Sequence, residues 1–178
     1  SRLSPRNNFV ARELQKHGLA TVLVDLLTPQ EDQLYENRFD IDLLSERLAE
    51  VTVFFRTYPL TQTHKIGYFG ASTGSASALK ASIKENNDIF AIVSRGGRPD
   101  LVTDIISEVK APVLLIVGSL DEYVLELNRK AFSLIKSKKE LEVVKGATHL
   151  FEEPGTLEKV AELSSKWFIE NQPVVYFL

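Results

Sequence analysis

Short apolar runs rich in β-branched residues alternate with longer amphipathic stretches, and this alternation limits the folds open to the chain. Strands that alternate with helices build βαβ units, whose strands run parallel in one sheet. Most of the runs are apolar throughout, as expected where helices cover both faces of a sheet. The sequence therefore predicts an α/β protein of three layers, α/β/α, around a mostly parallel sheet. Five strands are predicted, at residues 20–26, 65–71, 89–94, 113–119 and 141–145.

Six helices are predicted between the strands. The first, residues 5–17, follows Ser4, which is a favourable N-cap. In the second, residues 41–58, apolar residues recur every three or four positions. Thr156 is placed to cap the last helix. The polar connection 28–40 is predicted to be a surface loop, with a substrate lid as the alternative. The remaining helices are predicted at residues 75–85, 100–109, 124–137 and 157–170.

The composition narrows the class of protein. A chain of 178 residues suffices for one core, so residues 1–178 are predicted to be a single domain. The net charge is −3, so the chain lacks the excess of positive charge that is typical of nucleic-acid-binding proteins. A chain without cysteine cannot form disulfides, iron–sulfur clusters or thiolate zinc sites, and three histidines argue against a His-rich metal site. No apolar run is long enough to span a membrane and no signal peptide is recognised, so we expect a cytoplasmic protein.

Residues 70–74 read Gly-Ala-Ser-Thr-Gly, a G-x-S-x-G pattern. An apolar strand leads into this pattern and an Ala-rich helix leaves it, which is the context of a nucleophile elbow. Such a tight turn exposes the hydroxyl of Ser72, and the backbone N–H of Thr73 can donate to a developing oxyanion. The alternative is a small-residue turn in which Ser72 merely caps the helix.

A serine nucleophile needs a base and an acid that orients the base. Asp121 follows the strand 113–119 and His149 follows the strand 141–145, so all three residues lie at carboxyl ends of strands. Their chain order, Ser, Asp, His, is the one expected after a nucleophile elbow. We therefore predict Ser72, Asp121 and His149 as the catalytic residues.

Other residues compete for these roles. Glu122 is the nearest rival to Asp121 as the acid, and Asp121 itself could be a helix cap. His17 lies at the end of a helix and His64 at the start of a strand, so both are weaker candidates for the base than His149.

Two arginines follow the strand 89–94 in the sequence Arg-Gly-Gly-Arg. Arg95 and Arg98 are candidate substrate-binding residues, because guanidinium groups bind anionic groups through paired hydrogen bonds. The alternative is a surface turn with solvated arginines. Neither a P-loop nor a dinucleotide-binding pattern occurs, so nucleotide binding is not supported.

With these residues in place, the chain resembles α/β-hydrolases of the dienelactone-hydrolase-like group, over about residues 4–168. The resemblance implies Ser72 as nucleophile, Asp121 as acid, His149 as base, esters or lactones as substrates, and no cofactor. The founding activity of the group uses a cysteine, so its substrate is not implied here. Similar hydrolases occur alone or fused to a phosphoribosyltransferase domain. The resemblance rests on SPRNNFVARELQKHGLATVLVDLLTPQE, GASTGSASAL, SRGGRPDL, LLIVGSLDEYVLELNR and GATHLFEEPG.

The chain departs from this group before its first helix. The fold normally has a central strand there, between the strands 20–26 and 65–71, and a Gly-rich loop that completes the oxyanion hole. We therefore expect a sheet that lacks its usual N-terminal strands. Residues 173–178 (PVVYFL) are a candidate for the displaced central strand in a permuted chain. A truncated chain, or a tail strand elsewhere, are the alternatives.

The predicted function is a serine hydrolase that cleaves a small-molecule ester or lactone through an acyl-enzyme, with no metal, nucleic acid or membrane partner. Two alternatives remain. One is a non-catalytic α/β-hydrolase-like binding or partner domain, and the other is a flavodoxin-like doubly wound domain. The substrate's identity and the oligomeric state are not predicted.

Overall fold

The centre of the protein is a parallel sheet of four strands, in the order β1-β2-β3-β4. The computed structural model describes residues 2–84 and 88–173. Because the strands are parallel, their carboxyl ends meet at one edge of the sheet, which is where ligands bind in such folds. The strands are β1 (Tyr68–Ala71), β2 (Ile92–Arg95), β3 (Val113–Gly118) and β4 (Lys139–Val144).

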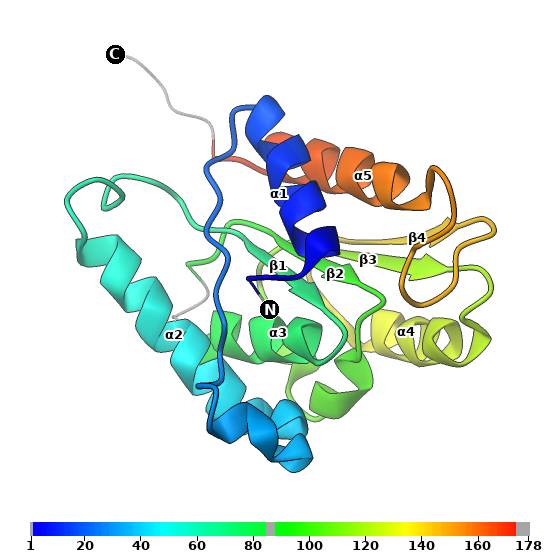
Figure 1. Ribbon diagram of the computed structural model, residues 1–178, viewed down its shortest axis with the longest axis horizontal. Coiled ribbons are helices and arrows are strands. Elements are labelled where there is room, and N and C mark those ends of the chain that lie inside the picture. The colour runs from blue at the N-terminus through cyan, green and yellow to red at the C-terminus, as the bar shows by residue number, and fades with distance from the viewer. Residues whose placement is uncertain (1, 85–87, 174–178) are drawn as a thin grey trace.

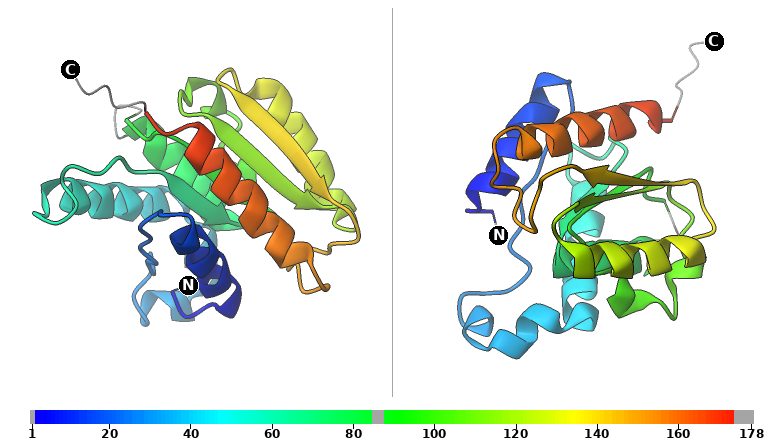
Figure 2. Two further views of the ribbon diagram at one scale, coloured as in Figure 1. Left: turned by 90° about the horizontal axis from the view of Figure 1, so that it is seen from above. Right: turned by 90° about the vertical axis from the view of Figure 1, so that its right-hand side faces the viewer.

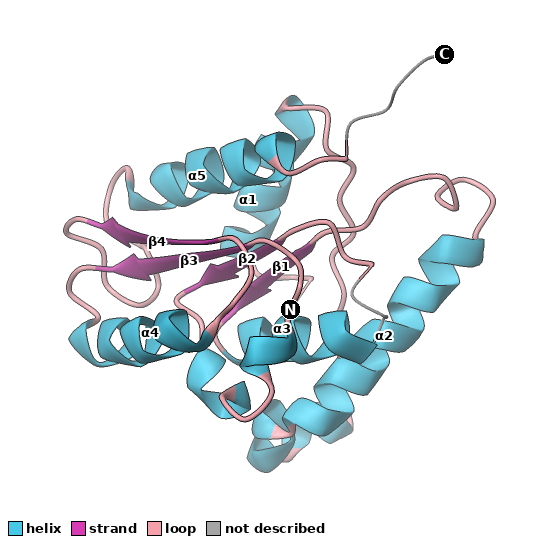
Figure 3. Ribbon diagram, turned by 180° about the vertical axis from the view of Figure 1, so that it is seen from behind, coloured by secondary structure: helices cyan, strands magenta, loops and turns pink. Residues whose placement is uncertain are grey.

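Helices cover both faces of the sheet (Figures 1 and 3). Alternate strand residues face opposite layers: Ile92 and Leu115 belong to the core under one layer of helices, and Val93 and Leu114 to the core under the other. The predicted three-layer architecture with a parallel sheet is therefore confirmed. One layer is α1 (Pro5–Lys16) and α5 (Thr156–Glu170), and the other is α2 (Ile41–Thr57), α3 (Thr73–Lys84) and α4 (Glu122–Leu134).

The predicted strand at residues 20–26 is wrong, because this segment joins no ladder within the described residues. It runs from the end of α1 to the connection 28–40 (Figure 2) and is held by side-chain hydrogen bonds. The carbonyl of Leu26 accepts a hydrogen bond from Arg47, and the carboxylate of Asp25 accepts hydrogen bonds from both the backbone N–H and Nε of Arg2. An apolar run predicts burial, but a strand also needs a partner for its backbone groups. In the described part of the chain, β1 pairs with β2 alone.

Two other predictions, on the helix at 100–109 and on the cap of the last helix, also differ from the structure. The helix expected at residues 100–109 is two short 3-10 helices, η3 (Pro99–Val102) and η4 (Ile106–Glu108). The N-cap of α5 is Gly155, with a φ of 81°, which only glycine adopts easily. Thr156 therefore does not cap this helix, and its hydroxyl donates to the carbonyl of Glu153 instead.

The strand predicted at residues 173–178 lies, beyond Pro173, outside the described residues. No helix in the described ranges combines the length and the apolar character that crossing a membrane requires.

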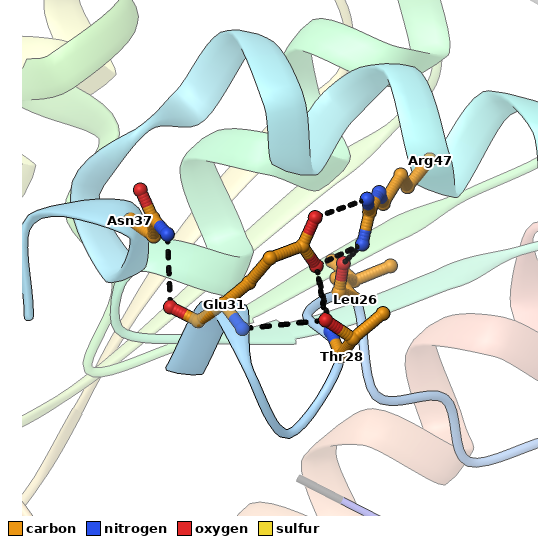
Figure 4. A network of polar contacts seen from close by, with 5 residues as sticks. All are labelled: Leu26, Thr28, Glu31, Asn37 and Arg47. Carbon is orange, nitrogen blue, oxygen red and sulfur yellow. Dashed lines mark hydrogen bonds and ion pairs between the residues drawn. The ribbon is translucent and has the colours of Figure 1, made fainter. Parts of the chain in front are cut away.

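The connection 28–40 is a surface segment, as predicted, and it contains the short helices η1 (Glu31–Gln33) and η2 (Tyr35–Phe39). One ion pair fastens it to α2 (Figure 4): Nη1 and Nη2 of Arg47 donate to the carboxylate of Glu31, at 2.6 Å each. The backbone and hydroxyl of Thr28 donate to the same carboxylate. The bond from Arg47, followed by those from Thr28, lowers the pKa of Glu31 from its usual 4.5 to about 2.

Candidate functional site

Ser72 lies between the last residue of β1 and the first residue of α3, and its backbone is strained. Its φ is 53°, which places a non-glycine residue in the left-handed region. Strain of this kind concentrates at functional sites, and it is expected of the serine in a nucleophile elbow. The turn therefore has the geometry that the G-x-S-x-G pattern predicts.

The two glycines of this pattern serve different purposes. A Cβ on Gly70 would lie 2.5 Å from the carbonyl oxygen of Gly74 and 2.6 Å from Cα of Ser75, both backbone atoms. A side chain at position 70 would therefore force β1 away from α3. A Cβ on Gly74, by contrast, would meet nothing within 4 Å. Only the first glycine is required by the close approach of strand and helix.

Asp121 and His149 form a hydrogen-bonded pair at the carboxyl ends of β3 and β4. Oδ2 of Asp121 lies 2.6 Å from Nδ1 of His149. Asp121 occupies the N-cap position of α4, yet its side chain makes no cap hydrogen bond and turns to the imidazole. The side chain of Asp121 is 14% exposed and that of His149 is 40% exposed. The rival acid, Glu122, does not make this contact, so of the two carboxylates Asp121 is the one that can orient His149.

The loop that carries His149 is fastened on both sides. Thr148 donates to the carboxylate of Glu153 through its backbone N–H and its hydroxyl. The hydroxyl of Ser119 accepts from the backbone N–H of Gly146, which ties this loop to the one that carries Asp121. Phe151 is 1% exposed and has a φ of 56°. A buried aromatic residue with positive φ is an outlier, so tertiary packing fixes the backbone two residues after His149.

Ser72 is hydrogen-bonded to the turn at residues 95–98, and His149 lies beside this turn. The backbone N–H of Ser72 donates to the carbonyl of Arg95, and the N–H of Arg98 donates to the carbonyl of Ser72. On the other side of this turn, a Cβ on Gly96 would lie 3.5 Å from Nδ1 of His149. The turn is thus the structural link between the candidate nucleophile and the candidate base.

A buried polar network supports this turn from behind, and the sequence analysis missed it. The amide of Asn128, which is fully buried, donates to the carbonyls of Gly97 and Val124. The hydroxyls of Ser75 and Ser94 bond to each other at 2.6 Å, and a Cβ on Gly97 would overlap both. Asn128 is a polar residue on the otherwise apolar face of a predicted helix, which is the signal that could have identified it.

Two polar groups at the site have no protein partner in the part of the chain that the structure describes. The hydroxyl of Ser72 is not hydrogen-bonded there, and no bond joins it to His149. The backbone N–H of Thr73, at the first position of α3, likewise donates to no group in these residues. The structure thus brings Asp121 and His149 together, while the roles of Ser72 and Thr73 stay predictions.

The two predicted substrate-binding arginines lie in contrasting surroundings. Arg98 forms a two-bond ion pair with Asp100, at 2.8 Å for each bond, and this pair raises the pKa of Arg98. Arg95 is buried and has no carboxylate partner among the described residues; Nη1 in particular bonds to nothing. Burial, followed by the nearby charge of Arg6, lowers the pKa of Arg95 to about 10. Arg98 is thus paired with a carboxylate, whereas Arg95 has no such partner among the described residues.

A parallel sheet with helices on both faces, a strained serine after β1 and an Asp–His pair after β3 and β4 are the features of an α/β-hydrolase. The comparison with known families agrees: the model of the dienelactone hydrolase family matches residues 9–168. The chain belongs to this family, so the flavodoxin-like alternative is wrong.

Solved structures give the same fold. The dienelactone hydrolase from Anabaena variabilis is 47% identical, with a TM-score of 0.94 over 97% of this chain and 82% of that one. Est1E from Butyrivibrio proteoclasticus is 17% identical, with a TM-score of 0.80 over 96% of this chain and 83% of its own, and at that identity it shows the fold alone. The family and the Anabaena structure together support a hydrolase.

Longer relatives also exist. Two curated proteins, from two strains of Mycobacterium tuberculosis, bear the name "Putative phosphoribosyl transferase" and are 54% identical to this chain over 171 residues. The matched part is 96% of this chain and 39% of theirs. The chain thus spans about two fifths of the length of the curated relatives it matches.

Proposed function

We propose that this chain is a serine hydrolase that cleaves an ester or lactone bond in a small molecule. The observation that carries the proposal is the 2.6 Å bond between Asp121 and His149, which share with the strained Ser72 one edge of the sheet. Ser72 is also hydrogen-bonded to the turn at residues 95–98, beside which His149 lies. An acid, a base and a nucleophile in this arrangement are the components of acyl transfer.

The proposed mechanism follows from the hydrogen bond that His149 makes to Asp121. Nδ1 of His149 faces the carboxylate of Asp121, which holds the proton on Nδ1 and leaves Nε2 free to act as base. Oγ of Ser72 attacks the acyl carbon while Nε2 takes the hydroxyl proton. The same proton passes to the leaving alkoxide as the bond to it breaks. Water then attacks the acyl-serine and gives a proton to Nε2. As the bond between the acyl carbon and Oγ breaks, Nε2 returns this proton to Oγ, which releases the acid and regenerates the enzyme.

The backbone N–H of Thr73 is the proposed oxyanion donor. It is the first N–H of α3, and such groups at a helix N-terminus carry partial positive charge and have no intrahelical partner. One such donor contributes about 10²–10³ in rate.

Labelling with a fluorophosphonate probe tests the proposal. Wild-type protein should be labelled, the Ser72→Ala variant should not, and the Ser107→Ala variant, on η4, should be labelled as the wild type is. A panel of p-nitrophenyl esters of graded chain length, together with lactones, then defines the bond cleaved. Failure of the folded protein to take the label and to turn over any member of the panel would contradict the proposal.

A second candidate is a non-catalytic domain that binds a ligand or partner. The hydroxyl of Ser72 has no hydrogen bond among the described residues, and this favours the binding domain, because a working triad joins the serine to the base. Catalytic hydrogen bonds are nevertheless often loose before substrate binds. The labelling experiment distinguishes the two candidates, since the binding domain predicts no reaction at Ser72.

A further inference from the structure

Asn128 on α4 is a buried polar residue that the proposed reaction does not use. It is fully buried, and its Oδ1 has no hydrogen-bond partner among the described residues. An unsatisfied buried oxygen costs free energy, so stability alone is a poor reason for an amide at this position. The contacts of its Nδ2 therefore point to a role besides stability. The other buried residues of α4 are apolar: Val124, Leu125 and Ala131.

Nδ2 of Asn128 makes one local hydrogen bond and one that joins distant parts of the chain. The local bond, of 2.8 Å, goes to the carbonyl four positions earlier in the same helix. The other, of 2.9 Å, goes to the carbonyl of Gly97, in the turn after β2. Gly97 also packs so closely on the hydroxyls of Ser75 and Ser94 that no Cβ fits there. Asn128 thus ties α4 to a turn that has little room to move.

The same helix carries the candidate acid. Asp121 is the N-cap residue of α4, and Asn128 lies seven positions further on, which is about two helical turns and therefore on the same side of the helix. Asp121 bonds to Nδ1 of His149, while Asn128 bonds to the turn beside which His149 lies. The helix α4 thus holds the acid–base pair and this turn in fixed positions relative to each other.

The candidate nucleophile is fastened to the same turn. The backbone N–H of Ser72 donates to the carbonyl of Arg95 at 3.3 Å, and the N–H of Arg98 donates to the carbonyl of Ser72 at 3.1 Å. Within the described residues no hydrogen bond joins the hydroxyl of Ser72 to His149. Hydrogen bonds instead lead from Ser72 through the turn to Asn128 and α4. The distance between nucleophile and base therefore depends on how Asn128 holds the turn.

We propose that Asn128 is a positioning residue for the hydrolase reaction. It acts through the carbonyl of Gly97, and it holds the turn so that Oγ of Ser72 lies within reach of Nε2 of His149. This inference rests on the proposed function and adds the residue that sets the geometry of that site. A misplacement of reacting groups by about 1 Å can cost about 10² in rate. Because Asn128 is fully buried, its effect falls on the rate and not on substrate binding.

Asn128→Leu removes both amide bonds and keeps a side chain of similar size. Its kcat on p-nitrophenyl acetate and its rate of fluorophosphonate labelling should fall about tenfold or more, while KM changes about twofold or less. The matched control is Asn171→Leu at the C-cap of α5, because Nδ2 of Asn171 also donates to the carbonyl four positions earlier, at 2.8 Å. This control should keep kcat within about twofold of the wild type.

The outcomes separate the positioning role from the proposed function. A wild-type kcat in folded Asn128→Leu protein, or equal losses in the variants at positions 128 and 171, would overturn the positioning role and leave the serine hydrolase intact. A folded wild type that takes no label and hydrolyses no ester would overturn both.

Asn128→Ser separates the two bonds of the amide. A serine hydroxyl donates to the carbonyl four positions earlier in a helix, as Ser164 does on α5, but it is too short to replace the bond to Gly97. This variant should therefore lose kcat as Asn128→Leu does. In nuclear magnetic resonance spectra, the backbone amides of Ser72 and Arg98 should shift in Asn128→Ser and stay unchanged in Asn171→Ser. Wild-type kcat in Asn128→Ser, or unshifted amides, would show that the bond to Gly97 does not hold the site.

Discussion

The imidazole of His149 and the carboxylate of Asp121 meet at 2.6 Å, although 28 positions separate the two residues in the chain. They come from loops after different strands, and a hydrogen bond from Gly146 to Ser119 ties those loops together. Asp121 could have capped α4, but its side chain makes no cap bond. Asp121 thus bonds to His149 instead of capping α4, as expected of a residue whose role is to orient the imidazole.

Replacing Asp121 by Asn should lower kcat on a p-nitrophenyl ester by about 10⁴-fold, because the amide favours the wrong tautomer of His149. The measurement is kcat at saturating ester. Glu122→Gln is the matched control, since it removes a neighbouring carboxylate that does not contact His149, and its kcat should change by about twofold or less. Equal effects of the two substitutions would show that general negative charge, rather than orientation, is what matters.

Ser72 gives a prediction about stability as well as activity. Its φ of 53° costs about 1–2 kcal/mol in a residue that has a Cβ. Ser72→Gly removes this strain, and the added flexibility of the unfolded chain offsets only part of the gain. Ser72→Gly should therefore be more stable to urea than Ser72→Ala by about 0.5–1 kcal/mol, with both variants inactive. A glycine variant less stable than the alanine variant would mean that the turn is unstrained.

The sequence predicted those parts of the site that depend on element order. Ser72, Asp121 and His149 each follow an apolar run, and parallel strands bring such positions to one edge. The prediction fails for residues 20–26. An apolar run indicates that a segment is buried, but it does not indicate whether a neighbouring strand is present to pair with it. The expected helix at 100–109 became two 3-10 turns for a related reason, since only tertiary packing decides how short connections close.

The sequence also did not predict which charged side chains are buried and which are paired. Arg95 and Arg98 are three positions apart, and both are candidates to bind an anion. Among the described residues, however, Arg95 is buried without a partner, whereas Arg98 is paired with Asp100. Arg6 lies 89 positions from Arg95, and nothing in its local sequence relates the two. Burial and pairing of a charge are properties of the assembled layers, which the pattern of apolar residues does not specify.

The two glycines of the G-x-S-x-G pattern should respond differently to alanine. Gly70→Ala places a Cβ against the backbone of Gly74 and should lower the free energy of unfolding by about 2 kcal/mol or more. Gly74→Ala meets open space inside α3 and should raise it by about 0.5–1 kcal/mol. Urea unfolding of both variants provides the measurement. Similar losses from both would contradict the assignment of the steric requirement to Gly70 alone.

Glu31 should make the connection 28–40 sensitive to acid (Figure 4). Its pKa is lowered from 4.5 to about 2 in the folded protein, chiefly by the hydrogen bond from Arg47. A depressed folded-state pKa means that the carboxylate stabilises the protein fully above pH 4.5, and that this contribution is lost as the pH falls towards 2. The difference in melting temperature between wild type and Glu31→Gln should therefore shrink between pH 5 and about pH 2. Glu36→Gln, an exposed residue on η2, is the control and should track the wild type throughout. A Glu31→Gln difference that stays constant over this interval would show that the ion pair does not hold the segment.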